Sequence, residues 1–104
     1  MERVASVADV PRGGLLAVGL KSGERVCLVR VNGEVYAVED RCTHADTPLS
    51  EGEMVEDYVI ECMLHGAQFD VRDGKVVLPP AEAPLPVYEV KVENGAIYVG
   101  GSKN

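Results

Sequence analysis

The sequence predicts an all-β domain built from antiparallel hairpins, and three observations lead to this fold class. Short runs of β-branched residues alternate between apolar and polar positions, as strands with one buried face do. Pairs such as Asn-Gly separate these runs and favour two-residue hairpin turns, because both residues tolerate positive φ. No window of a dozen residues keeps a helical period without interruption by glycine, proline or a β-branched residue. The length of 104 residues is that of one compact domain.

The predicted strands follow one another as hairpins. In chain order they cover Leu15–Leu20, Glu24–Val31, Glu34–Val38, Phe69–Val71, Lys75–Val77, Val87–Val92 and Ala96–Val99. The turn pairs between them are Ser22-Gly23, Asn32-Gly33, Asp73-Gly74 and Asn94-Gly95. Near the N-terminus, residues 8–12 predict one short turn before Pro11. Alternation is clearest within residues 24–31 and 87–92, which we expect to be well-formed strands.

Two stretches depart from this hairpin pattern. Residues 40–68 predict mainly loop, with one short strand near Tyr58–Glu61. Residues 79–86 hold four of the six prolines and must be extended and stiff, since each ring fixes φ and removes a hydrogen-bond donor. This proline stretch serves either as a rigid connector between strands or as a wall packed against whatever residues 40–68 enclose, and the sequence favours neither.

The net charge of −7 is concentrated in one part of the chain. Residues 39–70 hold nine acidic residues and one base, Arg41, whereas the remainder is close to neutral. An acidic balance without a basic run argues against nucleic-acid and membrane partners. The chain begins Met-Glu-Arg-Val, without the pattern of a signal peptide, so we expect a cytoplasmic protein. In that compartment, three cysteines indicate metal or redox chemistry rather than a disulfide framework.

Two short motifs in the acidic stretch pair a cysteine with a histidine. Cys42-Thr43-His44 has the form Cys-x-His, Cys62–His65 has the form Cys-x-x-His, and 17 residues separate them. Because both histidines of the chain lie within three residues of a cysteine, metal binding is favoured over buried cysteines and solvated histidines. Two Cys and two His can hold one tetrahedral zinc, although zinc modules usually pair like ligands. Mixed arms also suit two metal ions, with the Cys pair on one iron and the His pair on the other.

These motifs resemble those of the Rieske 2Fe–2S proteins, which have Cys-x-His, a longer gap, and then Cys-x-x-His. The resemblance extends to Gly66, to Phe69-Asp70 and to the proline stretch after an Asp-Gly turn, and it covers nearly the whole chain. It implies the Rieske fold, as a single domain over residues 1–104 with a cluster-binding subdomain at about residues 40–70. It also implies one Rieske-type 2Fe–2S cluster, and its ligands would be Cys42, His44, Cys62 and His65.

Three departures from the respiratory-chain Rieske proteins indicate a subfamily. Those proteins brace the cluster with a disulfide, where this chain has Thr47 and Leu64. They also direct a Ser and a Tyr hydroxyl toward the cluster and its Cys sulfur, where this chain has Ala67 and Phe69. They carry a membrane anchor, and we expect none in this protein. The departures point to the soluble Rieske-type ferredoxins of bacterial ring-hydroxylating dioxygenases.

The resemblance implies an electron carrier rather than an enzyme, with no catalytic residues of its own. It would pass electrons from an NAD(P)H-dependent ferredoxin reductase to a terminal oxygenase, and we expect it to act as a monomer. One alternative is a small Rieske subunit of a larger oxidoreductase, like the small subunits of nitrite reductases. A second alternative, from another class, is a structural zinc-binding interaction module.

Further expectations concern single residues. Without hydroxyls near the cluster, the reduction potential should lie near the low end of the Rieske range of about −150 to +300 mV. His44 and His65 should contact the partners, and the acidic stretch should form a collar around them that steers basic docking faces. Met63 and Leu64 should form an exposed apolar patch beside His65 or a cover that shields the cluster from water, and the two roles are compatible. Cys27 should pack as a small apolar residue within its strand.

Overall fold

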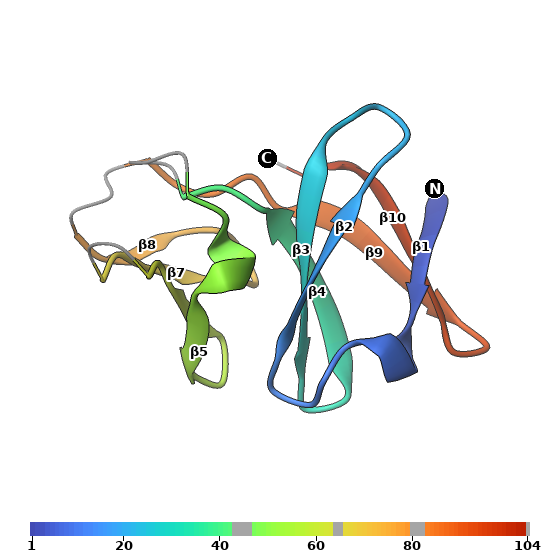
Figure 1. Cartoon of the computed structure of the whole chain (residues 1–104), viewed down its shortest axis with the longest axis horizontal. Helices are drawn as coiled ribbons and strands as arrows, with labels where there is room; N and C mark the ends of the chain where they lie inside the picture. The colour runs from blue at the N-terminus through green and yellow to red at the C-terminus, as the bar shows by residue number, and fades with distance from the viewer. Residues whose placement is uncertain (43–46, 64–65, 80–82, 104) are drawn as a thin grey trace.

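The computed structural model describes residues 1–42, 47–63, 66–79 and 83–103. Within these ranges it has ten strands in three antiparallel sheets, which confirms the predicted all-β fold class (Figure 1). Two short 3-10 helices, η1 (Val7–Asp9) and η2 (Leu49–Glu51), complete the elements of the described chain. No helix in these ranges is long and apolar enough to cross a membrane.

The three sheets are arranged side by side (Figure 1). The first has the order β1-β10-β9, formed by Glu2–Ser6, Ala96–Ser102 and Tyr88–Glu93. The second has the order β2-β3-β4, formed by Leu15–Gly19, Arg25–Val31 and Glu34–Glu39. The third has the order β5-β6-β7-β8, formed by Glu53–Glu56, Val59–Glu61, Gln68–Asp70 and Val76–Leu78. Because β5–β8 lie between β4 and β9 along the chain, the third sheet is an insertion into the other two.

The Asn-Gly pairs form the predicted tight turns. Asn32 and Gly33 have φ values of 50° and 81°, and Asn94 and Gly95 have 51° and 77°, so both residues of each turn are in the left-handed region. The pair Asp73-Gly74 does not fit this prediction. Only Gly74 of that pair has a positive φ, of 80°, and its N–H donates to the carbonyl of Asp70, which makes a wider turn between β7 and β8.

Two strands were not predicted from the sequence. The prediction of loop is wrong for β5, where Met54 alone is partly buried and the alternation is therefore hidden. This strand exists through its pairing with β6, in which Met54 lies opposite Ile60. In β1, a register shift between Arg3 and Ala5 interrupts the alternation that would have marked the strand.

The middle sheet is buried on both faces, because alternate residues of β3 enter two different cores. Val26 and Leu28 pack with residues of β9 and β10 in one core. Cys27 and Val29 pack with residues of β6 and β7 in the other, which we call the distal core. The buried members of the distal core are Cys27, Val29, Val31, Val38, Cys42, Leu49, Ile60, Cys62, Ala67, Phe69, Val71, Leu85 and Val87. The third sheet is thus attached to the rest of the molecule by a continuous apolar contact.

The end of the proline stretch belongs to the distal core. Leu85 is fully buried in it, and its N–H donates to the carbonyl of Gly74 at 2.8 Å. The carbonyl of Pro86 accepts the N–H of Glu39 at 3.0 Å, and Val87 forms a bridge with Val38. Residues 83–87 therefore connect two sheets and also form one wall of this core, so both interpretations of the proline stretch hold for this part of it.

Candidate metal centre

The structure brings two of the four predicted ligands into one core. Cys42 and Cys62 are each only 1% exposed, and both belong to the distal core although 20 positions of sequence separate them. His44 and His65 lie outside the described residues. Among the residues that the structure describes, no three His, Cys, Asp or Glu side chains gather as a metal site. The thiol pair is thus the part of the predicted site that can be examined.

The segment that carries Cys42 is closed by a buried carboxylate. Asp40 is 5% exposed, and its two oxygens accept hydrogen bonds from the N–H of Ser50 at 2.7 Å and from the Ser50 hydroxyl at 2.8 Å. Its own N–H donates to the carbonyl of Arg25 at 3.0 Å, which ties it to β3. Inside this closure, the N–H of Cys42 donates to the carbonyl of Thr47 at 2.9 Å. Asp40 therefore connects the two ends of the segment 40–50, which we call the first loop, and attaches them to the middle sheet.

Asp40 is a site residue that the sequence reasoning missed. The sequence places it among the nine acids of residues 39–70 that we expect to form a collar around the histidines, whereas the structure places it in the interior. Its partner Ser50 is ten residues away, so the pair matches no local turn or capping motif. The available signal in the sequence is the position of this acid, two residues after the predicted strand Glu34–Val38 and two residues before a predicted ligand.

The second loop is closed by backbone hydrogen bonds. Cys62 follows β6, and its N–H donates to the carbonyl of Ala67, one residue before β7, at 2.8 Å. The carbonyl of Cys62 accepts the N–H of Gly66 at 3.2 Å. Cys62 therefore lies at the loop end of the β6–β7 hairpin, where backbone hydrogen bonds fix its position. The hydrogen bonds between Asp40 and Ser50 fix the segment of Cys42 in a comparable way.

The surroundings of the two cysteines are apolar. Leu49, Ala67, Phe69 and Leu85 are fully buried in the distal core, and none of them carries a side-chain hydroxyl. Gly74 supports this wall, since a Cβ on it would overlap the carbonyl oxygen of Leu85. Such surroundings exclude water and provide no side-chain donor for a sulfur from the Ala67 and Phe69 positions.

Cys27 shares the distal core but has a different character. It is fully buried within β3, and burial, followed by the charge of Asp40, raises the pKa of its thiol. A thiol of this kind stays protonated and is a poor metal ligand or nucleophile. The structure thus agrees with the expectation that Cys27 packs as a small apolar residue.

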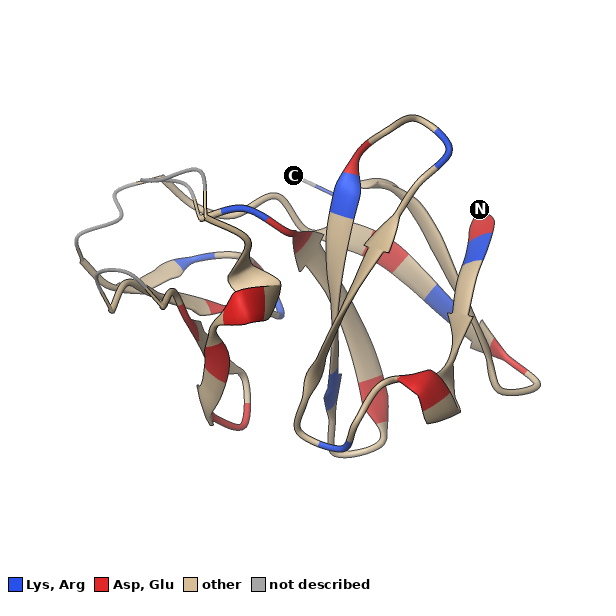
Figure 2. Cartoon of the chain, viewed as in Figure 1, with Lys and Arg blue, Asp and Glu red and all other residues tan. Residues whose placement is uncertain are grey.

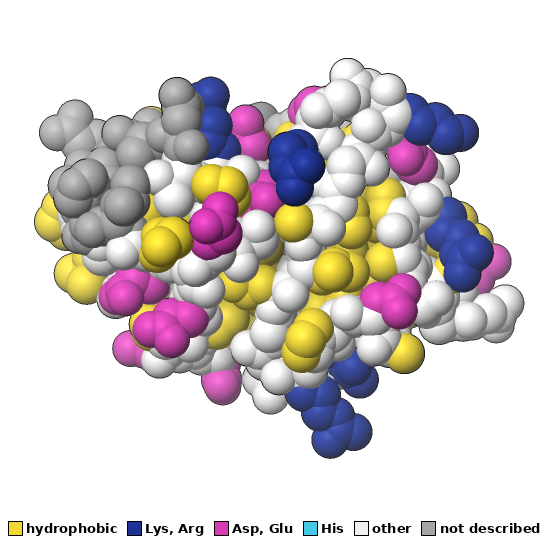
Figure 3. Space-filling model, viewed as in Figure 1, with side chains coloured by type: hydrophobic (Ala, Val, Ile, Leu, Met, Phe, Trp, Pro, Cys, Tyr) yellow, Lys and Arg dark blue, Asp and Glu magenta, His cyan; other side chains and the backbone are white. Residues whose placement is uncertain are grey.

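The rim of the third sheet combines acidic and apolar side chains. A hollow of about 250 Å³ is lined by Glu51, Gly52, Glu53, Glu61 and Met63, and Met63 is 55% exposed. Glu53 and Glu61 lie directly opposite each other on β5 and β6, an arrangement of like charges that disfavours the sheet. Gln68 partly offsets it by donating to Glu61 at 2.9 Å. Figure 2 shows acidic residues on η2 and β5, and in Figure 3 acidic and hydrophobic side chains share this part of the surface.

The acidic rim is smaller than the collar expected from the sequence. Asp40 is buried, and Asp70 forms an ion pair with Arg72 at 2.7 Å. Asp46 lies outside the described residues. Among the described acids of residues 39–70, the exposed ones are Glu51, Glu53, Glu56 and Asp57, and Asp73 in the β7–β8 turn is exposed as well. The exposed carboxylates of the described part of the stretch 39–70 are thus on η2 and on the β5–β6 hairpin.

Comparisons with known proteins agree with this architecture. Residues 1–89 match the model of the Rieske [2Fe-2S] domain. The chain is 42% identical over 93 residues to the 3-phenylpropionate/cinnamic acid dioxygenase ferredoxin subunit of Escherichia coli strain K12, a match that covers 89% of this chain and 86% of the relative.

Solved structures give the same result. The ferredoxin of Sphingomonas yanoikuyae B1 has a TM-score of 0.88 and 30% identity, over 95% of this chain and 96% of that one. A chain in the complex of reduced oxygenase and oxidized ferredoxin of carbazole 1,9a-dioxygenase also has a TM-score of 0.88, with 37% identity over 94% of this chain and 99% of that one.

The donor chemistry of this site suits the cofactor of that family. Thiolates are the ligands that iron–sulfur clusters require, and replacement of two of them by imidazoles on one iron is the Rieske variant. Cys42 and Cys62 reach a single dry core from two closed loops, as one cluster between them would need. The chain therefore belongs to the Rieske [2Fe-2S] family, and its cofactor is a single Rieske-type 2Fe–2S cluster.

Proposed function

We propose that this protein is a one-electron carrier that takes an electron from an NAD(P)H-dependent ferredoxin reductase and delivers it to a terminal oxygenase. The observation that carries the proposal is the match over 89% of the chain to a dioxygenase ferredoxin subunit. The solved complex of oxygenase and ferredoxin in the carbazole system supports the oxygenase as a partner. Within this proposal the chain is a single Rieske domain over residues 1–104, with residues of about 40–70 as its cluster-binding part.

The proposed ligands are Cys42 and Cys62 for one iron and His44 and His65 for the other. When bound, the cluster would supply a centre that takes up and releases one electron. The chain's own residues would set the conditions: the Asp40–Ser50 closure orients the first loop, and the apolar distal core keeps water from the sulfurs. Since the Ala67 and Phe69 positions offer no hydroxyl, the reduced and more negative state receives less stabilisation, which favours a low potential.

Metal and redox analysis of the purified protein tests this proposal. We expect two iron and two acid-labile sulfide per chain, a red-brown colour, and the uptake of one electron per chain. Replacing Cys42 or Cys62 with serine should remove the colour and most of the iron. One zinc per chain without colour would overturn the proposal and leave the structural zinc module. Purification in a fixed complex with a larger oxidoreductase would instead favour the small-subunit alternative.

We also propose that partners dock on the rim formed by Met63 and the carboxylates of Glu51, Glu53 and Glu61. Opposed carboxylates on β5 and β6 lower the stability of the sheet, so a partner with basic groups would relieve a repulsion that the free protein carries. The exposed thioether of Met63 lies in the same hollow and would contact the aliphatic part of a lysine or arginine side chain.

Stopped-flow reduction of cytochrome c, a basic one-electron acceptor, measures the steering by this rim. The rate should fall as ionic strength rises from about 0.01 M to about 0.15 M, because the Debye length shortens from about 30 Å to about 8 Å. Glu53→Gln together with Glu61→Gln should weaken this dependence. The control is Glu89→Gln together with Glu93→Gln, which removes two exposed acids on β9 and so matches the loss of two charges. Equal salt dependence in the two double variants would show that the rim is only a solvated surface.

A further inference from the structure

We propose that Tyr58 and Arg72 are positioning residues, which clamp one end of the β6–β7 hairpin onto the middle sheet and so fix the strand that leads to Cys62. We call Tyr36, Tyr58, Asp70 and Arg72 the latch. The existence of the latch does not depend on the cluster. Its consequence for the metal centre rests on the proposed role of Cys62 as a ligand.

The β6–β7 hairpin has a latch end and a loop end. At the latch end, the carbonyl of Tyr58 accepts the N–H of Val71 at 2.9 Å. At the loop end, the N–H of Cys62 donates to the carbonyl of Ala67 at 2.8 Å. Between them lie three cross-strand pairs, Val59 with Asp70, Ile60 with Phe69 and Glu61 with Gln68. Because this ladder is short and continuous, a displacement at Tyr58 is transmitted to Cys62.

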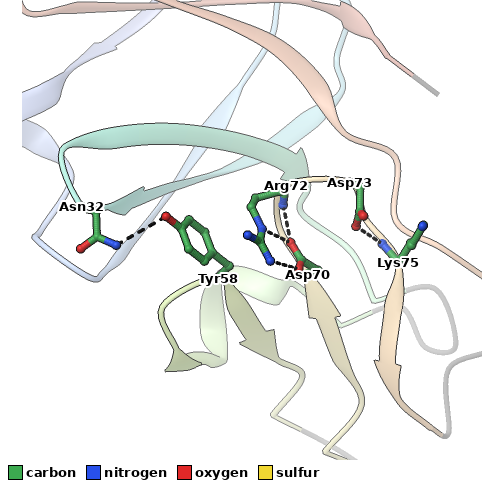
Figure 4. A network of polar contacts seen from close by, with 6 residues as sticks. All are labelled: Asn32, Tyr58, Asp70, Arg72, Asp73 and Lys75. Carbon is green, nitrogen blue, oxygen red and sulfur yellow. Dashed lines mark hydrogen bonds and ion pairs between the residues drawn. The ribbon is translucent and has the colours of Figure 1, made fainter.

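The ring of Tyr58 joins the third sheet to the middle sheet. The guanidinium carbon of Arg72 lies 4.1 Å from the centroid of the Tyr58 ring, within the range of a cation–π contact. On the side of the middle sheet, the ring of Tyr36 on β4 meets the Tyr58 ring edge to face, at 5.9 Å and 86°. The amide of Asn32, in the β3–β4 turn, is 3.5 Å from the Tyr58 hydroxyl (Figure 4). Tyr58 is thus held by groups from both sheets at once.

Asp70 acts through Arg72. Its carboxylate accepts from Nε at 3.1 Å and from Nη2 at 2.7 Å of the Arg72 guanidinium, and also from the Arg72 backbone N–H at 2.9 Å. This fork fixes the plane of the guanidinium beside the Tyr58 ring (Figure 4). A lysine in place of Arg72 would keep the charge but would lose the two-point fork.

The latch differs from the distal core in what its loss should do. The core contacts between the sheets are fully buried, whereas the Arg72 side chain is 53% exposed and Tyr58 is only partly buried. Removing the latch should therefore leave the molecule folded and loosen the β6–β7 hairpin locally. Local opening of this kind is measured by native-state hydrogen exchange.

Hydrogen exchange of the purified protein with its cluster tests the latch. We expect Tyr58→Ala to raise exchange rates in β6 and β7 by about tenfold, the order expected for loss of one aromatic pair and one cation–π contact. Arg72→Ala removes only the cation–π contact of this ring and should raise them by about two- to fivefold. Rates in β3 should change far less. Tyr58→Phe keeps the ring contacts and should behave like the original protein, and Arg72→Lys should be intermediate. Lys91→Ala is the matched control, because Lys91 forms a similar exposed ion pair with Glu93 at 2.8 Å on β9.

The result for β6 and β7 decides the proposal. It would be overturned if Arg72→Ala changed exchange in the hairpin no more than Lys91→Ala does, or if exchange rose equally in β3, which would indicate a general loss of stability. Should Tyr58→Ala fail to fold, Arg72→Ala and Arg72→Lys give the same decision. The visible circular dichroism of the bound cluster is recorded in parallel. A loosened hairpin with an unchanged cluster spectrum would overturn the positioning role and leave the latch as a structural contact only, whereas ligation by Cys62 is decided separately by its serine variant.

Discussion

Replacing Ser50 with alanine removes one of the two hydrogen bonds that Ser50 gives to the carboxylate of Asp40. The lost bond is short, at 2.8 Å, and the acceptor is charged and 5% exposed, so water cannot easily replace the hydroxyl. A hydrogen bond to a charged group contributes about 1.5–3 kcal/mol. At about 2 kcal/mol, and with a shift of about 4–8 °C per kcal/mol for a domain of this size, we expect Tm to fall by roughly 8–16 °C.

Thermal unfolding followed by far-ultraviolet circular dichroism measures this loss. The control is Ser22→Ala, because Ser22 also donates to a carboxylate, that of Glu24, at 3.1 Å on the exposed β2–β3 turn. That exposed bond should contribute no more than about 0.5 kcal/mol. A second expected effect is faster bleaching of the cluster in Ser50→Ala, since the loop that carries Cys42 loses part of its closure. If both variants melted within about 2 °C of each other, Asp40 would not be the buried anchor that the hydrogen bonds indicate.

Three further changes test other parts of the molecule. Gly74→Ala should lower the free energy of unfolding by more than Gly33→Ala does. Both glycines have positive φ, but only at Gly74 would a Cβ meet a backbone oxygen. Urea denaturation should give a loss of about 1 kcal/mol for Gly33→Ala and a distinctly larger loss for Gly74→Ala. Phe69→Tyr should raise the midpoint potential in a redox titration by supplying a hydroxyl in the core, and an unchanged potential would contradict the low-potential argument. The hydrogen bonds from Arg72 lower the pKa of Asp70, so this carboxylate stabilises the fold above its unfolded pKa of about 3.9, and that contribution disappears as the pH falls through the lower folded pKa. Asp70→Asn should therefore be less stable near pH 7, and in an acid denaturation series the difference should shrink as the pH falls below about 3.9 and vanish below the folded pKa. A difference that persisted at the lowest pH would contradict this linkage.

The parts of the fold that the sequence predicted are those in which local chemistry and tertiary structure agree. Asn32-Gly33 and Asn94-Gly95 have an intrinsic preference for positive φ, and both occur as two-residue turns. The alternation within β3 is strong because each face meets its own core. By contrast, β5 was not predicted, since only Met54 marks it as a strand and its pairing with β6 depends on the third sheet as a whole.

In the metal centre, too, the features that could be predicted are local in sequence, and those that could not depend on tertiary contacts. The spacing of Cys42 and Cys62 relative to the histidines is a local property, and it led to the family. The pairing of Asp40 with Ser50 and the contact of Tyr58 with Arg72 and Tyr36 depend on how the chain folds back. A carboxylate or a tyrosine at those positions reads in sequence as surface charge or sheet face, because nothing in its neighbours specifies a distant partner.

Because β3 is buried on both of its faces, the protein should not tolerate an insertion or a deletion within this strand. Side chains alternate with a period of two, so deleting one residue before Val26 would reverse which side chains enter each core over the rest of the strand. Such a deletion would move Cys27 and Val29 against the first sheet and transfer Leu28 to the distal core. Substitutions that conserve volume can be absorbed in either core separately. Insertions in this family should therefore accumulate in the loops between strands, while the middle strand keeps a fixed count of residues between its two turns.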